Sequence, residues 1–182
     1  MYAERPLRYL GIAALTLAVL SIAAAWLVNP WFSLWRHAYS DLGGPRAYQP
    51  WIFNYGLVAS GLLTSLYSLW LFKSSLNKFE CAGSAFTFIA GLFLALIGMF
   101  PLGTDPHFFV SVWFFVQIGL AAVAWGLGLI YRGAKWLGSA SLLIVALSVA
   151  AASIVKWPSI AALETLGIAA VAAWILLMFK VT

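Results

Sequence analysis

The sequence predicts an all-α membrane protein: a bundle of six transmembrane helices with a short interfacial helix in the first outer loop. Of its 182 residues, 64% are hydrophobic and only 8% are charged, and the mean hydropathy is +0.99. Soluble domains carry roughly 45–50% apolar and about 25% charged residues. The composition therefore excludes a water-soluble domain, a disordered chain and a disulfide-stapled module. The single cysteine, Cys81, leaves no intramolecular disulfide.

Six stretches reach the roughly 20 apolar residues that a spanning helix needs. They cover residues 7–28, 51–72, 79–100, 108–131, 136–155 and 160–179. Pro, Gly and charged residues separate them, such as Asn29-Pro30 after the first span. The small residues 23–25 would also suit a signal-peptide cleavage site, but the apolar run is long for one. We therefore expect a retained helix and a single six-span domain over residues 1–182.

The basic residues predict the orientation of the chain. Seven of the ten Lys and Arg residues fall on the side of the termini and of the second and fourth loops. Short loops rich in Lys and Arg stay in the cytoplasm. With two acids, that side carries a net charge of +5, whereas three basic and three acidic residues leave the other side neutral. We expect a cell-membrane protein with cytoplasmic N- and C-termini.

Because the net positive charge is explained by the orientation of the chain in the membrane, it gives no support to nucleic-acid binding. Membrane lipids are the expected partners, and a homo-oligomer or a partner membrane protein is a further candidate. The membrane interior carries few polar groups, such as Thr64 and Gln117, and no charged relay, which disfavours a channel or an ion-coupled transporter. In the third span, Gly91, Ala95 and Gly98 predict close helix packing.

The first outer loop is predicted to contain the interfacial helix, over residues 30–42. Asn29 suits its N-cap, Pro30 suits its first position, and apolar residues follow at helical spacing. The polar face of this helix either meets water or turns His37, Ser40 and Asp41 toward the mouth of the bundle. Spacings of three and four residues would let these side chains converge.

A second group of polar residues opens the fourth span. Asp105 before Pro106 suits the cap of this helix, and that role alone would explain the carboxylate. His107, Ser111 and Gln117 then descend one broad face of the helix. They either line a polar cavity or satisfy each other and the nearby backbone, which is the commoner role in membrane bundles.

Glu164 lies about one turn into the last span, where an isolated carboxylate is costly. We expect it to face inward or to pair with Lys156, Arg36 or Arg46, as a structural ion pair or as a functional acid. Asn54 in the second span is a further candidate for a lining residue.

Two segments together resemble a known family. One is His37–Gly43, with the letters HAYSDLG; the other is Gly98–Pro101, followed by Asp105 and His107. The first is similar to the Ser-Asp/Glu-Leu-Gly motif, and the second to the Gly-x-Phe-Pro…Asp…His segment, of the membrane family called domain of unknown function 998. The six-span layout agrees, so the resemblance runs over most of the chain. It implies a fold and the location of a site rather than a reaction.

The chain is more distantly similar to multi-span hydrolases of the alkaline ceramidase and adiponectin-receptor superfamily, which hold zinc with three histidines. It has two histidines and lacks the late His-x-x-x-His pair of those enzymes. Catalytic zinc usually takes three protein ligands and one water. His37, His107 and one of Asp41, Asp105 or Glu164 would suffice, although the spacing does not indicate zinc. Two histidines would also suffice as the ligands of a haem group. The residues around them give no sign of a haem site.

Two functions follow as hypotheses. The first is an outward-facing polar site that binds, and in an enzyme would hydrolyse or modify, a lipid-like or other amphiphilic ligand. The catalytic candidates are His37, Ser40, Asp41, Asp105 and His107, and the ligand-binding candidates are Arg36, Arg46, Asn54, Ser111, Gln117 and Glu164. The second is a non-catalytic structural or accessory subunit of a membrane complex, in which the outer charges form fixed pairs and caps.

Under the first hypothesis, an arginine would hold a phosphate or carboxylate. A histidine would act as general base with Asp41 as its orienting partner. Ser40, or a metal-activated water in its place, would be the nucleophile. No Gly-x-Ser-x-Gly elbow supports Ser40 in this role.

Overall fold

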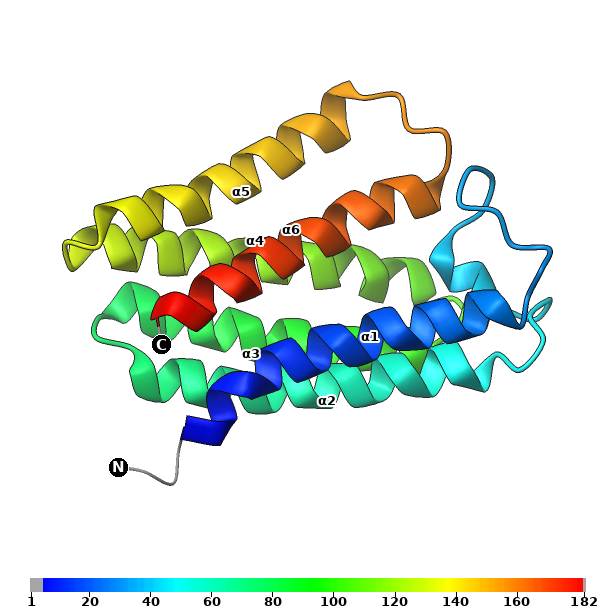
Figure 1. The fold of residues 1–182 in the computed structure, drawn as a ribbon, viewed down its shortest axis with the longest axis horizontal. Helices are drawn as coiled ribbons and strands as arrows, with labels where there is room; N and C mark the ends of the chain where they lie inside the picture. Colours follow the sequence, from blue (N-terminus) through cyan, green and yellow to red (C-terminus); the bar gives the residue numbers. More distant parts are fainter. Residues whose placement is uncertain (1–4, 182) are drawn as a thin grey trace.

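Six helices that are long and apolar enough to cross a membrane form the structure, as the sequence predicts. The computed structural model describes residues 5–181, and this part of the chain contains no strand. Two 3-10 helices accompany the α-helices (Figure 1). The elements are η1 (Arg5–Tyr9), α1 (Leu10–Leu27), η2 (Tyr39–Gly43), α2 (Trp51–Ser74), α3 (Lys78–Met99), α4 (His107–Tyr131), α5 (Lys135–Ile154) and α6 (Ile160–Val181).

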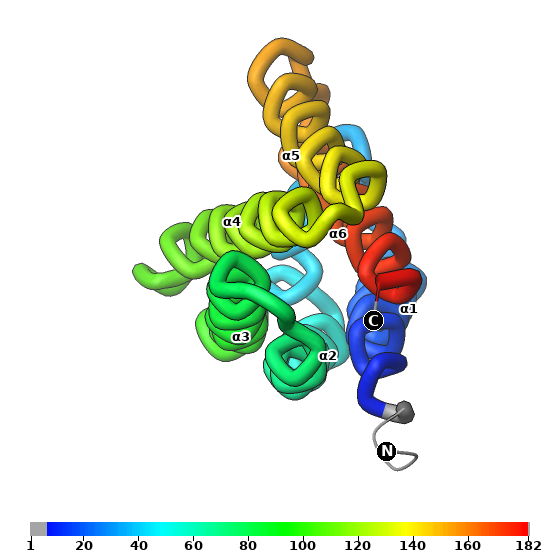
Figure 2. The backbone as a smooth tube through the Cα atoms, turned by 90° about the vertical axis from the view of Figure 1, so that its left-hand side faces the viewer, coloured from blue at the N-terminus to red at the C-terminus, as the bar shows by residue number. Residues whose placement is uncertain are grey.

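Helices α1, α2, α3, α4 and α6 surround a common centre, and α5 lies outside them against α4 and α6 (Figure 2). The connections divide the molecule into two ends. The first-loop end holds residues 28–50, 100–106 and 155–159, and the terminal end holds η1, the end of α6 and residues 75–77 and 132–134. Helices α2, α3 and α4 follow one another as antiparallel neighbours with the most extensive packing in the molecule.

Glycine allows α2 and α3 to approach closely. A Cβ atom on Gly91 would lie 2.6 Å from Ser65 N and 2.7 Å from Gly61 O, which are backbone atoms of the facing helix. A Cβ atom on Gly98 would likewise meet the carbonyl oxygen of Asn54. The close packing predicted from Gly91, Ala95 and Gly98 is therefore present, and α2 is the neighbour that uses it.

A buried ion pair joins α3 to the end of α4 at the terminal end. Glu80 is completely buried, and its Oε1 lies 3.2 Å from Nε of Arg132. Its Oε2 accepts a hydrogen bond from Leu76 N at 2.7 Å. Asn77 caps α3 by accepting from the amides of residues 79 and 80, and its Nδ2 donates to Gly128 O at 3.1 Å. A buried carboxylate is stable only with such partners, so these contacts fix the α3–α4 packing at this end.

The interfacial helix predicted over residues 30–42 is not formed. This segment consists of turns followed by η2. Polar side chains compete for the backbone groups that a helix would use. The amide of Ser33 donates to Nδ1 of His37 at 2.9 Å, and the amide of Ala38 donates to Oδ2 of Asp41 at 2.8 Å.

Asn29, predicted as the N-cap of that helix, instead ties the two ends of the loop together. Its buried Nδ2 donates to Ala25 O at 2.8 Å and to Tyr48 O at 3.0 Å. Its Oδ1 accepts from Tyr48 N at 2.7 Å and from Trp31 Nε1 at 3.0 Å. The loop is thus closed onto the end of α1.

Replacing Gly91 by Ala should destabilise the protein, because the new methyl group would press on the backbone of α2. We expect the free energy of unfolding to fall by about 1–3 kcal/mol, the usual range for overpacking. Thermal unfolding of the purified protein in detergent measures this change. Gly119→Ala is the matched control: a Cβ there meets nothing within 4 Å, so its stability should be unchanged or higher. Equal stability of the two variants would contradict the packing described for α2 and α3.

Candidate functional site

A cavity of about 600 Å³ lies between α4, α5 and α6. Helix α5 is buried only near its start, at Gly138 and Ser141. The hydroxyl of Ser141 donates to Ala122 O of α4 at 2.7 Å, and Gly138 packs against the backbone of α4. Beyond this contact α5 diverges from α4 toward the first-loop end (Figure 1). We call the space that this divergence opens the lateral groove.

The lateral groove is apolar along its length and open at its side. Among the residues that line it, Phe108 is 79%, Val149 is 59% and Ile160 is 62% exposed. These residues belong to three different helices, so the opening faces outward between them. In a bilayer this surface meets lipid chains, because the helices around it have the length and hydropathy of membrane spans.

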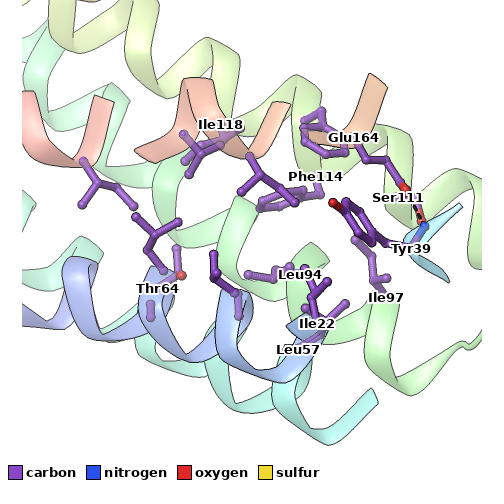
Figure 3. Close-up of a pocket in the computed structure, with 18 of the residues that line it drawn as sticks. Ile22, Tyr39, Leu57, Thr64, Leu94, Ile97, Ser111, Phe114, Ile118 and Glu164 are labelled. Atoms are coloured by element: carbon purple, nitrogen blue, oxygen red, sulfur yellow. Dashed lines mark hydrogen bonds between the residues drawn. The ribbon is translucent and has the colours of Figure 1, made fainter. Parts of the chain in front are cut away.

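A second, smaller cavity of about 110 Å³ lies between α1, α2, α3, α4 and α6, and we call it the inner cavity (Figure 3). Apolar side chains such as Ile22, Leu57 and Leu94 provide most of its lining. Both cavities touch the same wall of α4, α6 and η2. The residues that line both are Ser40, Ser111, Phe115, Ile118, Glu164, Val171 and Trp174. Ser40, Ser111 and Glu164 lie toward the first-loop end, whereas Trp174 lies farther along α6.

The Glu164 side chain is hydrogen-bonded to the backbone of the first loop. Its Oε2 accepts a hydrogen bond from Tyr39 N at 2.8 Å (Figure 3). The Tyr39 hydroxyl lies 3.0 Å from Oγ1 of Thr165, and Ala161 N donates to His37 O at 2.8 Å. Among residues 5–181, no ion pair joins Glu164 to the three cations expected as its partners, Lys156, Arg36 and Arg46. One carboxylate oxygen is thus held by the protein, and the side chain borders both cavities.

His107 begins α4 and is buried at the end of the lateral groove. Its Nδ1 lies 2.7 Å from the carbonyl oxygen of Phe100. A carbonyl can only accept, so Nδ1 carries the hydrogen, and in the neutral ring Nε2 is an acceptor. Ser111 follows four residues later and therefore lies on the same face of α4, one turn along. Both side chains line the groove.

Ser40 reaches the shared wall from η2. Its side chain is 7% exposed and lines both cavities. Asp41 stabilises the turn that presents it, through the hydrogen bond from Ala38 N to its carboxylate. Asp41 itself lines neither cavity. Its role in the structure is to shape η2.

The structure thus gathers Ser40, His107, Ser111 and Glu164, four of the residues named from the sequence, around the groove. His37 lies elsewhere: its ring packs on Trp31 at 5.3 Å between ring centroids. The Asp41 carboxylate bonds to the backbone rather than to His37.

The other predicted ligand-binding residues, and the catalytic candidate Asp105, lie outside both cavities. Arg36, Arg46 and Asp105 are exposed at the first-loop end, and the Arg46 guanidinium lies over the Trp31 ring. Asn54 donates through Nδ2 to Gly43 O at 3.0 Å, which joins α2 to η2. Gln117 is buried in α4 without lining either cavity.

The candidate metal ligands named from the sequence form hydrogen bonds with different backbone groups. Within residues 5–181, no three His, Cys, Asp or Glu side chains are close enough together to hold a metal ion. His37 bonds to Ser33 N, His107 to Phe100 O and Glu164 to Tyr39 N.

Sequence reasoning missed two features of this site. Tyr39 was not singled out, although it lies inside the HAYSDLG segment, and its amide is what holds Glu164. The apolar part of the groove was also missed, because the residues of α5 that line it, such as Ile144 and Val149, are typical of any membrane span. The position of Glu164 one turn into a membrane span was the available signal for the first feature.

These observations define a class: a polytopic membrane protein with a laterally open apolar groove that ends in a polar wall. The chain belongs to the family described as "Protein of unknown function (DUF998)", whose model matches residues 12–180. No curated protein and no solved structure matches the chain.

Replacing Glu164 by Ala should loosen η2, because the amide of Tyr39 would lose its acceptor. Leaving such a group unpaired costs about 1–3 kcal/mol, so amide hydrogen exchange over residues 38–43 should become about tenfold faster or more. Mass spectrometry of the protein in detergent micelles measures this exchange. Glu164→Gln retains an acceptor oxygen and should change the rate less. Asp105→Ala, which removes an exposed carboxylate at the same end, should leave it unchanged; equal rates in all three variants would contradict the Tyr39–Glu164 bond.

Proposed function

We propose that this protein binds a lipid-like amphiphile in the lateral groove, with the polar part of the ligand at Ser40, His107, Ser111 and Glu164. The observation that carries the proposal is the combination of an apolar groove open toward lipid with four polar side chains, Ser40, His107, Ser111 and Glu164, gathered at one of its ends. An amphiphile has the same division between a chain and a head group. The volume of about 600 Å³ lies in the range of about 300–1,000 Å³ that is usual for small-molecule sites.

The charge distribution supports an orientation for this site. The loops and termini at the terminal end carry most of the Lys and Arg residues. Short basic loops favour the cytoplasmic side. In a cell membrane the first-loop end would then lie at the outer face, and the ligand would enter sideways from the outer leaflet.

Filling the groove should abolish binding. Gly119 lines the groove with open space around its Cβ position, so Gly119→Phe would place a ring where the chain of the ligand lies. We expect saturable binding of tritiated monooleoylglycerol, of monooleoylglycerol phosphate, or of both to the wild type, and a loss of at least about tenfold in affinity in this variant.

The matched control is Leu120→Phe, because Leu120 is 41% exposed on the same helix and lies outside the groove. This variant should bind as the wild type does. No saturable binding of either lipid to the wild type, or equal binding by all three proteins, would contradict the proposal. Such an outcome would favour the structural or accessory subunit instead.

Hydrolysis of the bound amphiphile is a second candidate function, favoured by one observation. His107 presents an acceptor nitrogen one turn before the Ser111 hydroxyl, and its other nitrogen is fixed by Phe100 O. A nucleophile, a base and a group that orients the base are the usual parts of such a site. His107 would take the proton from Ser111, or from a water, as the oxygen attacks an ester carbonyl, and would return it to the alcohol that leaves when the ester C–O bond breaks. With Ser111 as the nucleophile, a water would then hydrolyse the acyl-serine and release the fatty acid.

If hydrolysis occurs, His107→Gln should slow it strongly, because glutamine can still donate to Phe100 O but cannot act as a base. General-base catalysis contributes about 10²–10⁴-fold, and release of oleate from monooleoylglycerol should fall accordingly. His37→Gln is the matched control and should leave the rate unchanged, since His37 lies outside the groove. Equal rates in the wild type and both variants would contradict a catalytic role of His107.

A further inference from the structure

We infer that the lateral groove selects a head group without negative charge that donates hydrogen bonds, such as the hydroxyls of a monoacylglycerol, over an anionic phosphate head group. The inference rests on the proposed function and names the chemistry of its ligand. It follows from the charges at the polar end of the groove and from the hydrogen-bonding atoms left free there.

The polar end of the groove contains no cation that could pair with a phosphate. No Lys or Arg side chain among residues 5–181 lines the lateral groove or the inner cavity. Arg36, Arg46 and Lys156, the three basic residues of the first-loop end, are all exposed. A buried anion without a partner is strongly unfavourable. When it is ionised, the carboxylate of Glu164 would add repulsion to this penalty.

The atoms available to a ligand are mainly acceptors. Oε2 of Glu164 accepts from Tyr39 N, and its other oxygen accepts no hydrogen bond from the described residues. Nε2 of His107 is an acceptor in the neutral ring, because Nδ1 donates to Phe100 O. The Ser40 and Ser111 hydroxyls can donate or accept. A head group with several O–H donors matches this set, whereas a phosphate offers further acceptors.

The helix ends beside the groove have hydrogen-bond partners for only some of their amides. Unpaired amides at a helix N-terminus can bind anions. In α6, Ala161 N donates to His37 O at 2.8 Å, and Ala162 N donates to Ser159 Oγ at 3.0 Å. At the start of α4, His107 N donates to Thr104 O at 3.2 Å, whereas no carbonyl of residues 100–106 accepts from the amides of Phe108 and Phe109. The preference therefore rests on the missing cation and on the free acceptor atoms.

The test compares two ligands that differ only in the phosphate. Tritiated monooleoylglycerol and monooleoylglycerol phosphate are titrated separately against the purified full chain at neutral pH. We expect the uncharged lipid to bind at least about tenfold more tightly. Tighter or equal binding of the phosphate would overturn the inference and leave the proposed function standing. Binding of neither lipid would overturn both.

Glu164→Gln tests the origin of the preference. It keeps an acceptor for the Tyr39 amide but cannot ionise, so the affinity ratio between the two lipids should move toward one. Asp105→Asn removes one charge from an exposed side chain at the same end and should leave the ratio unchanged. A ratio unaltered by Glu164→Gln, or altered equally by the two variants, would overturn the inference.

Discussion

The hydrogen bond from the Tyr39 amide to the Glu164 carboxylate is the contact on which the candidate site depends. It joins η2, in the long first loop, to α6, almost at the other end of the chain. The bonds from Ala161 N to His37 O and from Ser159 Oγ to Leu34 O reinforce the same junction. Because η2 is held there, Ser40 faces α4 and α6 and completes the polar wall. Helix α5 has no comparable attachment at this end, and its divergence from α4 opens the groove.

The two carboxylates inside the membrane spans differ in what satisfies them. Glu80 is completely buried, pairs with Arg132 and accepts a backbone hydrogen bond, so both of its oxygens are engaged by the protein. Glu164 has one backbone donor and borders two cavities. Charged groups at such depths persist only when paired or used. The first pattern is that of a structural ion pair, and the second is that of a group with bonding capacity left for a ligand.

The membrane spans could be predicted from hydropathy because a bilayer requires about 20 apolar residues per helix. A close helix contact of α3 could be expected from Gly91 and Gly98, but the sequence does not tell that α2 is the partner. Ser40, His107, Ser111 and Glu164 could be chosen because polar groups near hydrocarbon are rare. The first loop could not be predicted: helical spacing of apolar residues does not reveal that the His37 and Asp41 side chains accept hydrogen bonds from the amides of Ser33 and Ala38. The divergence of α5 depends on tertiary packing, for which Gly138 and Ser141 give no separate signal.

The position of a bound chain tests the central claim most directly. Monooleoylglycerol carrying a diazirine in its acyl chain can be photo-crosslinked to the protein in nanodiscs, and the modified residues located by mass spectrometry. The account predicts adducts concentrated on the groove-lining parts of α4, α5 and α6, between residues 108 and 119, 144 and 152, and 163 and 171, which an excess of unlabelled lipid suppresses. Adducts spread evenly over exposed lipid-facing residues of α1, α2 and α3, such as Leu20, Leu62 and Leu92, and insensitive to competitor would contradict it.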